Sequence, residues 1–285
     1  MALHELFGLL PAPGLLPAPG LLLALVCAGV VAGFLAGLLG VGGGLVIVPA
    51  LVWVLEAAAP GGAHVQHLAV GTSLAVMVFT SFSSVLAHHR KGAVDWSIVR
   101  RMVPAMVIGT FAGAQIAGSI PSQALKWFFV AYAYVIAAQM YFNLKPAASR
   151  TLPGTAGTFA AGGVIGVVSS FVGIGGGSMS VPFMTWCNVP IHRAIATSAA
   201  LGWPIAVSGA LGYLVSGRAA AGLPWGSVGF VYLPAMVVLL AVTVCFAPLG
   251  ARMAHRLPVA RLKRVFALLM VVMASEMLWS LLRAG

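Results

Sequence analysis

The sequence predicts an all-α polytopic membrane protein that consists of two inverted repeats. Hydrophobic residues make up 61% of the 285 positions and charged residues only 7%, a composition far from that of soluble domains. Apolar runs of helix length follow one another from Leu21 to Leu282, as expected for a chain that crosses a bilayer several times. A glycine-rich motif interrupts these runs once in each half of the chain, which indicates that the chain is duplicated.

The same composition excludes several other classes of protein. A membrane β-barrel needs short segments that alternate between apolar and polar residues, and these runs do not alternate. The formal net charge is +11, but the basic residues stand beside hydrophobic segments, where they orient helices. We therefore expect a lipid bilayer as the partner and no nucleic acid. Because the pairs His64/His67 and His88/His89 lack supporting Cys, Asp or Glu ligands, no metal is expected, and no cofactor motif is present.

Matched residues in the two halves indicate how the chain divides. Gly42-Gly43-Gly44 match Gly175-Gly176-Gly177, and Thr72-Ser73 match Thr197-Ser198. Such recurrence at corresponding positions is the sign of an internal repeat. We divide the chain into a Pro-rich lead-in, a first repeat, a connecting loop and a second repeat, at 1–19, 20–145, 146–154 and 155–285.

Five hydrophobic segments can be drawn in each repeat. The second segment of each repeat is short, so the sequence leaves open whether 44–57 and 178–188 span the membrane or re-enter it. Eight to ten transmembrane helices are therefore predicted. The ten segments are roughly 20–39, 44–57, 68–88, 102–119, 125–143, 155–173, 178–188, 194–215, 228–250 and 264–282.

The placement of basic residues predicts that the repeats are inverted. The loop at 88–101 is rich in Lys and Arg whereas its counterpart at 216–227 is not, and the bias is reversed between 119–126 and 250–264. Equivalent loops therefore lie on opposite sides of the membrane, because basic loops stay on the cytoplasmic side. We expect a multi-pass protein of the bacterial inner (cytoplasmic) membrane with both termini outside.

The two glycine clusters are the first candidate site. Because glycine has no Cβ, successive N–H groups can turn toward a ligand, and the helix that follows adds partial positive charge at its N-terminus. Two such helix starts that face one cavity suit a small anion, and tight helix packing is the alternative explanation of the glycines. A nucleotide is not expected, since the GxGxxG pattern fails. The predicted substrate-binding residues are Gly42, Gly43, Gly44, Thr72, Ser73, Gly175, Gly176, Gly177, Ser178, Ser180, Thr197 and Ser198.

Three titratable residues are candidates for proton coupling. Glu276 lies about two-thirds along the last hydrophobic segment, and an intramembrane carboxylate is a functional hypothesis by default. A hydrogen-bonded structural acid is the alternative. His67 and His192 titrate near neutral pH, but each stands at a predicted helix start, where a capping or interfacial role is equally plausible.

At these motifs the chain resembles the TauE/SafE sulfite-exporter family, also called the toluene-sulfonate uptake permease family. The resemblance rests on Gly33 to Pro49, on Gly166 to Pro182 and on the segments Ala69–Ser73 and Ala194–Ser198. It covers about residues 20–284. It implies a bacterial inner-membrane carrier of small sulfur-containing or organic anions, often in export, with the glycine clusters and the Thr-Ser pairs along the substrate path.

The sequence as a whole predicts a secondary transporter that exports a small anion, such as sulfite or a sulfonate, by alternating access. A passive anion channel is the alternative, and a structural or assembly role is less favoured. An enzyme is not expected, because four scattered acidic residues supply no catalytic cluster. The identity of the anion, the direction of transport, the coupling ion and homo-oligomer formation stay open.

Overall fold

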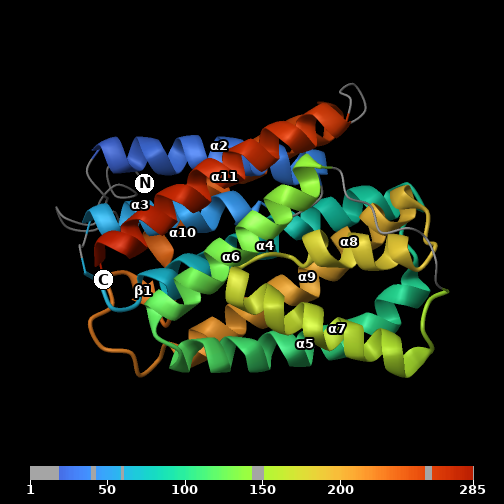
Figure 1. The fold of residues 1–285 in the computed structure, drawn as a ribbon, viewed down its shortest axis with the longest axis horizontal. Coiled ribbons are helices and arrows are strands. Elements are labelled where there is room, and N and C mark those ends of the chain that lie inside the picture. Colours follow the sequence, from blue (N-terminus) through green and yellow to red (C-terminus); the bar gives the residue numbers. More distant parts are fainter. Residues whose placement is uncertain (1–18, 40–42, 59–60, 143–150, 254–258, 285) are drawn as a thin grey trace, which may run out of the picture.

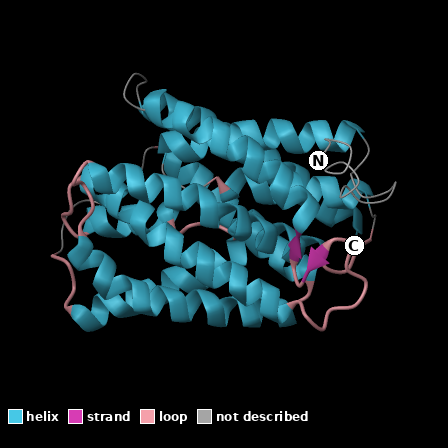
Figure 2. Ribbon diagram, turned by 180° about the vertical axis from the view of Figure 1, so that it is seen from behind, coloured by secondary structure: helices cyan, strands magenta, loops and turns pink. Residues whose placement is uncertain are grey.

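The computed structural model describes residues 19–39, 43–58, 61–142, 151–253 and 259–284. This part of the chain is almost entirely helical (Figures 1 and 2), as the sequence predicts. Its elements are α2 (Pro19–Leu39), α3 (Gly44–Ala58), α4 (Val65–Arg90), α5 (Trp96–Ser119), α6 (Ser122–Tyr141), α7 (Thr155–Val172), α8 (Gly177–Trp186), α9 (Ile191–Ser216), β1 (Ser227–Val228), β2 (Val231–Tyr232), α10 (Leu233–Met253) and α11 (Val259–Ala284).

Six of the described helices are long and apolar enough to cross a membrane, fewer than the eight to ten predicted. The helices α3 and α8 have only 15 and 10 residues, or about 22 and 15 Å at 1.5 Å per residue. A hydrocarbon core of about 30 Å is too thick for either of them alone. The six spans are Gly20–Gly37, Val65–Arg90, Trp96–Ser119, Thr155–Val172, Ile191–Ser216 and Arg264–Arg283.

The helices α4 and α9 form the centre of the molecule and pack antiparallel to each other. A β-carbon at Gly209 would lie 2.8 Å from Cδ1 of Leu74, and one at Gly202 would lie 3.8 Å from Oγ of Ser81. Residue numbers thus fall along α9 as they rise along α4. These two helices are also the most buried of the candidate spans.

Two further helix pairs flank this centre and depend on small residues. The helix α2 packs on α10, and α5 packs on α7; Figure 1 shows α2 and α11 along one side of the molecule and α5 and α7 along the opposite side. A β-carbon at Gly33 would lie 2.7 Å from Cα of Thr243, and one at Gly162 would lie 2.8 Å from the carbonyl oxygen of Met102. These glycines therefore permit close backbone approach, as in other membrane helix pairs.

Two local features differ from the sequence prediction. The segment drawn from 228 begins with a β-hairpin, β1 paired antiparallel with β2, because Gly226 and Gly229 adopt positive φ and turn the chain before α10. Lys126, which stands where the predicted loop 119–126 and the predicted segment 125–143 overlap, lies within α6 and is only 6% exposed. Its ammonium group pairs with the carboxylate of Glu56.

Candidate functional site

The two glycine breaks meet in the interior of the molecule. A β-carbon at Gly44 would fall well inside contact distance of the carbonyl oxygen of Gly173, so the start of α3 lies directly against the second break. The hydroxyl of Ser73 donates a 3.0 Å hydrogen bond to that same carbonyl. Three predicted site elements from distant parts of the sequence are therefore brought together, while Gly42 lies outside the described residues.

Left-handed glycines produce the breaks. Gly43 has φ of 71°, Gly173 has φ of 76° and Gly176 has φ of 71°, a region that residues with a β-carbon rarely adopt. Gly173 ends α7 as its left-handed C-cap, the usual role of glycine at that position. Gly176 is the N-cap of α8, so the chain leaves one helix and begins another within three residues.

The two breaks contact the preceding helix in a matched way. A β-carbon at Gly43 would lie 3.0 Å from the carbonyl oxygen of Ala32 and 3.4 Å from Cβ of Ala36. A β-carbon at Gly176 would lie 3.2 Å from Cγ2 of Ile165 and 3.3 Å from Oγ of Ser169. Ala36 and Ser169 occupy the same position relative to their glycine, so a methyl group at the first break is replaced by a hydroxyl at the second.

Hydroxyl groups gather around the second break. Ser169 is fully buried, and its Oγ has no hydrogen-bond partner among the described residues. The hydroxyls of Ser178 and Tyr132 are 2.6 Å apart, and Ser180 donates to Ser198 over 2.8 Å. Four of these five residues come from α7, α8 and α9 of the second half, and Tyr132 comes from α6.

The first turn of α8 has free donors beside these hydroxyls. No side chain caps the helix at Gly176, and no carbonyl of the described residues accepts a hydrogen bond from the backbone N–H of Gly177 or Ser178. Unsatisfied N–H groups and the positive end of the helix dipole attract anions. The second break therefore combines backbone donors with the unpartnered hydroxyl of Ser169.

The hydroxyls of the two predicted threonines accept equivalent hydrogen bonds from the backbone. The Thr72 hydroxyl accepts a 2.9 Å hydrogen bond from the N–H of Tyr232, directly before α10. The Thr197 hydroxyl accepts a 3.0 Å bond from the N–H of Asp95, directly before α5. Both hydroxyls therefore hold the start of a helix from the other half of the chain, whereas Ser73, Ser180 and Ser198 lie at the breaks.

The two predicted histidines have different surroundings. His67 is 1% exposed, and its Nε2 lies 2.9 Å from the carbonyl oxygen of Ala117 and 3.1 Å from that of Ile120. Its ring also stacks on Phe230 at 4.8 Å. His192 is exposed in the first turn of α9. The structure therefore places neither histidine beside the glycine breaks.

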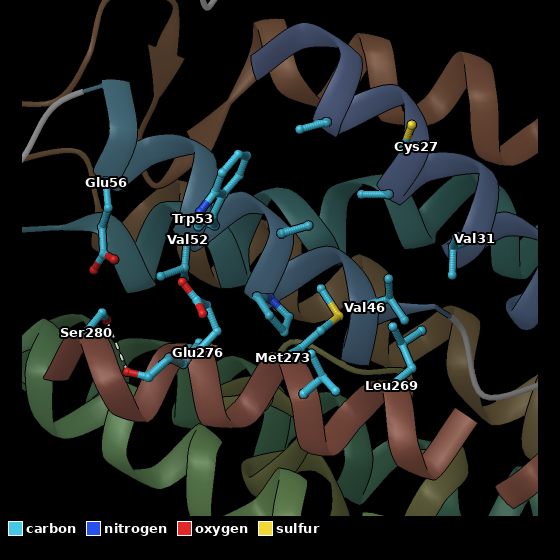
Figure 3. A pocket seen from close by; sticks show the side chains of 16 residues that line it. Cys27, Val31, Val46, Val52, Trp53, Glu56, Leu269, Met273, Glu276 and Ser280 are labelled. Carbon is cyan, nitrogen blue, oxygen red and sulfur yellow. Dashed lines mark hydrogen bonds between the residues drawn. The ribbon is translucent and has the colours of Figure 1, made fainter. Parts of the chain in front are cut away.

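Glu276 lines a separate cavity of about 470 Å³ between α2, α3 and α11. Most of the cavity wall is apolar, and Figure 3 shows the carboxylates of Glu276 and Glu56 directed toward it. Lys126 contacts both Glu56 and the hydroxyl of Ser280, so an ion pair lies at the cavity boundary. Within the described residues no group of three or more His, Cys, Asp or Glu side chains is arranged to hold a metal.

Two residues at the second break were missed by sequence reasoning. Ser169 could have been found by aligning the repeats, because it replaces Ala36 seven residues before the matched glycines Gly176 and Gly43. Tyr132 carried no such signal, since its contact with Ser178 joins α6 to α8 across the molecule.

Comparison with known proteins adds independent information. The family model for sulfite exporter TauE/SafE proteins matches residues 25–277. A probable membrane transporter protein of Haemophilus influenzae is 36% identical over 257 residues, which cover 90% of this chain and 97% of the relative. YdhB of Bacillus subtilis and YfcA of Escherichia coli, also described as probable membrane transporter proteins, are 28% and 25% identical. They cover 81% and 86% of this chain and 89% and 84% of the relatives. No solved structure matches the chain.

Proposed function

Because the chain belongs to the sulfite exporter TauE/SafE family, we propose that it is a secondary transporter that exports a small oxyanion across the bacterial inner membrane. The family and the names of its relatives indicate a membrane transporter. Sulfite and small sulfonates are the substrates that we propose, since they carry several acceptor oxygens and a negative charge. The second glycine break is the binding site in this proposal.

The observation that carries the proposal is the uncapped start of α8 next to a buried hydroxyl without a partner. The N–H groups of Gly177 and Ser178 have no acceptor among the described residues, and Ser169 Oγ has none either. An oxyanion would accept hydrogen bonds from all three, and bonds to a charged acceptor are about twice as strong as neutral ones. Leaving such donors buried without an acceptor is costly.

Alternating access in this proposal uses two inverted repeats, α2 to α6 and α7 to α11. The antiparallel packing of α4 on α9, the pairing of α2 with α10 and of α5 with α7, and the matched surroundings of Gly43 and Gly176 support it. Transporters with such repeats bind their substrate where discontinuous helices meet. We propose both termini outside, with the basic loops on the cytoplasmic side.

Glu276 is our proposed proton carrier. It lies in a candidate span and lines the cavity of Figure 3, where Lys126 already neutralises the other carboxylate, Glu56. An intramembrane carboxylate is a functional hypothesis by default, and the position of Glu276 on a cavity wall supports this proposal. His67 and His192 stay weaker proposals for the same role, because neither lies near this cavity or the breaks.

A variant separates proton coupling from anion binding. In Glu276→Gln we expect sulfite exchange between equal pools to persist, while accumulation driven by a pH gradient is lost, because the glutamine cannot change its charge. The measurement is sulfite exchange and gradient-driven uptake in the same proteoliposomes. Gradient-driven uptake at the wild-type level would remove Glu276 from the proposal and leave the membrane potential as the driving force, at about 2.3 kcal/mol per charge per 100 mV.

The proposed function is tested by sulfite counterflow in proteoliposomes, with sulfoacetate, sulfate and lactate as competitors. We expect saturable exchange that unlabelled sulfite on the opposite side accelerates. Flux without this acceleration would contradict a carrier and indicate a channel. Absence of flux for every anion, with the protein shown to be folded, would overturn the proposal.

A further inference from the structure

One stripe of α4 faces the second glycine break. A β-carbon at Gly173 would lie 3.2 Å from Cα of Val70, and one at Gly175 would lie 2.8 Å from Cε of Met77. Between these two residues, Ser73 donates its hydrogen bond to Gly173. Residues three or four apart share a helix face, so Gln66 continues the same stripe toward the start of the helix.

Gln66 is buried without any partner for its side chain. The residue is 1% exposed, and neither Nε2 nor Oε1 makes a hydrogen bond within the described residues. Buried polar side chains are nearly always paired, and an unpaired one needs a functional or structural explanation. An apolar residue of similar size at this position would cost less free energy to bury, so we expect the amide to bind a group beyond the described residues.

The surroundings of Gln66 connect it to the second break. Its backbone N–H donates to Ser122 Oγ over 3.0 Å, so the first turn of α6 lies next to it. The same helix α6 carries Tyr132, which contacts Ser178 at the start of α8. The helices α4 and α6 thus both run from Gln66 toward the second break, and Gln66 lies about 10 Å from Ser73 along α4 at 1.5 Å per residue.

From this geometry we infer that Gln66 is a second, outer binding station for the transported oxyanion, between the site at the second break and the end of the molecule where α4 begins. The inference rests on the proposed function. The amide NH2 donates two hydrogen bonds, and the N-terminus of α4, a helix of 26 residues, adds partial positive charge. Because the glutamine is uncharged, it holds an anion without trapping it.

Only the first repeat has a glutamine at this position. The residue that corresponds to Gln66 in the second repeat is Ile191, which is exposed at the start of α9. In this inference the transported anion meets an amide on the path that α4 and α6 border, whereas the matched position of the second repeat holds an aliphatic side chain. Substitution of Gln66 is expected to change the apparent KM for sulfite on one membrane face.

The test compares Gln66→Leu and Gln66→Met with a matched control, Gln115→Leu. Gln115 is a glutamine whose amide already donates to the Gly212 carbonyl over 2.9 Å, so its loss reports the structural cost alone. In proteoliposomes of defined orientation, we expect both Gln66 variants to raise the KM for sulfite about tenfold at the face where α4 begins. We expect the KM at the other face, and the melting temperature of the protein, to stay at wild-type values.

Three outcomes would overturn the inference. These are an unchanged KM in both Gln66 variants, an equal change at both faces, and a loss of stability in both variants as large as that of Gln115→Leu. The last would show that the amide is structural. Failure of the proposed function is distinguishable, because it would remove sulfite transport from the wild-type protein itself, and failure of the site at the second break would leave Ser169→Ala fully active.

Discussion

The break before α3 and the break before α8 hold a left-handed glycine, Gly43 or Gly176, against the preceding helix through equivalent contacts. The side chains around them differ. At the first break the neighbour is Ala36, and every residue of α3 from Gly44 to Val52 is buried. At the second break the neighbour is Ser169, and α8 opens with polar residues. Both breaks therefore share a backbone geometry, and only the second has the hydroxyl-bearing neighbour on which the proposed anion site depends.

The largest effect is expected where the two breaks touch. In Gly44→Ala the new methyl group would collide with the Gly173 carbonyl, a backbone atom that cannot rotate away. We expect a loss of stability of about 3 kcal/mol, the upper end of the usual cost of overpacking. The measurement is the melting temperature of the detergent-purified protein.

The control for this substitution is Gly20→Ala. A β-carbon at Gly20 would have no atom within 4 Å, so this variant is expected to melt like the wild type. Equal melting temperatures for the Gly44 and Gly20 variants would show that the breaks are not in contact.

The next largest effect is expected at Ser169. Hydrogen bonds to charged groups contribute about 1.5–3 kcal/mol, so Ser169→Ala should reduce the kcat/KM of sulfite exchange about 10- to 100-fold. The fold should be retained, because the hydroxyl has no partner among the described residues. The measurement is the initial rate of exchange in proteoliposomes.

The matched control is Ala36→Ser, which places a hydroxyl at the first break. We expect its exchange rate to resemble that of the wild type. If Ser169→Ala and Ala36→Ser exchanged sulfite at the same rate, the claim that only the second break contributes to anion binding would be contradicted.

A smaller effect is expected at the ion pair near the cavity. Lys126→Met leaves Glu56 without its partner, and removal of one member of a fully buried pair costs about 3–5 kcal/mol. The Glu56 side chain is 35% exposed, so we expect about 1–2 kcal/mol here. Thermal melting of Lys126→Met and of the double variant with Glu56→Gln tests this. The double variant should recover part of the loss, and an additive loss would contradict a direct interaction.

The smallest effect is expected at Asp95, the N-cap of α5. The Ser97 hydroxyl, followed by the N–H groups of Ile98 and Ser97, lowers the pKa of the Asp95 carboxyl below its ordinary value. A lowered pKa in the folded state stabilises the protein above the unfolded value of about 3.9, and this contribution is lost as pH falls through the folded pKa.

The loss of this cap in Asp95→Ala is expected to cost about 1 kcal/mol at pH 7. The cost should begin to shrink as the pH falls below about 4 and should be lost as the pH passes through the lowered pKa of Asp95 in the folded protein. Melting temperatures of the wild type and the variant across this pH range provide the test. A difference that stays constant with pH would show that the charge of Asp95 is unimportant.

Much of the fold could be predicted because its signals are local. Apolar runs predicted most helices, and the breaks follow from glycines, which adopt positive φ far more readily than residues with a β-carbon. The pair of Lys126 with Glu56 could not be predicted, since it joins residues 70 positions apart in the sequence. The hairpin before α10 was missed because its residues are as apolar as those of the helix that follows.

The candidate site was predicted only in outline. Sequence reasoning selected Ser178 and Ser180 by their proximity to the glycines, and the Thr-Ser pairs by their recurrence at matched positions of the two repeats. It could not tell that Thr72 and Thr197 accept hydrogen bonds from the starts of α10 and α5, because those contacts depend on how the halves pack. Ser169 and Gln66 stand out only once burial and the absence of a partner within the described residues are known.

The most direct test of the account is equilibrium binding of sulfite, and of sulfoacetate in parallel, to the purified protein by titration calorimetry. We predict saturable binding of one of these anions to the wild type and to Ala36→Ser. We also predict an affinity at least tenfold weaker in folded Ser169→Ala. Equal affinities in all three proteins would contradict a binding site at the second glycine break.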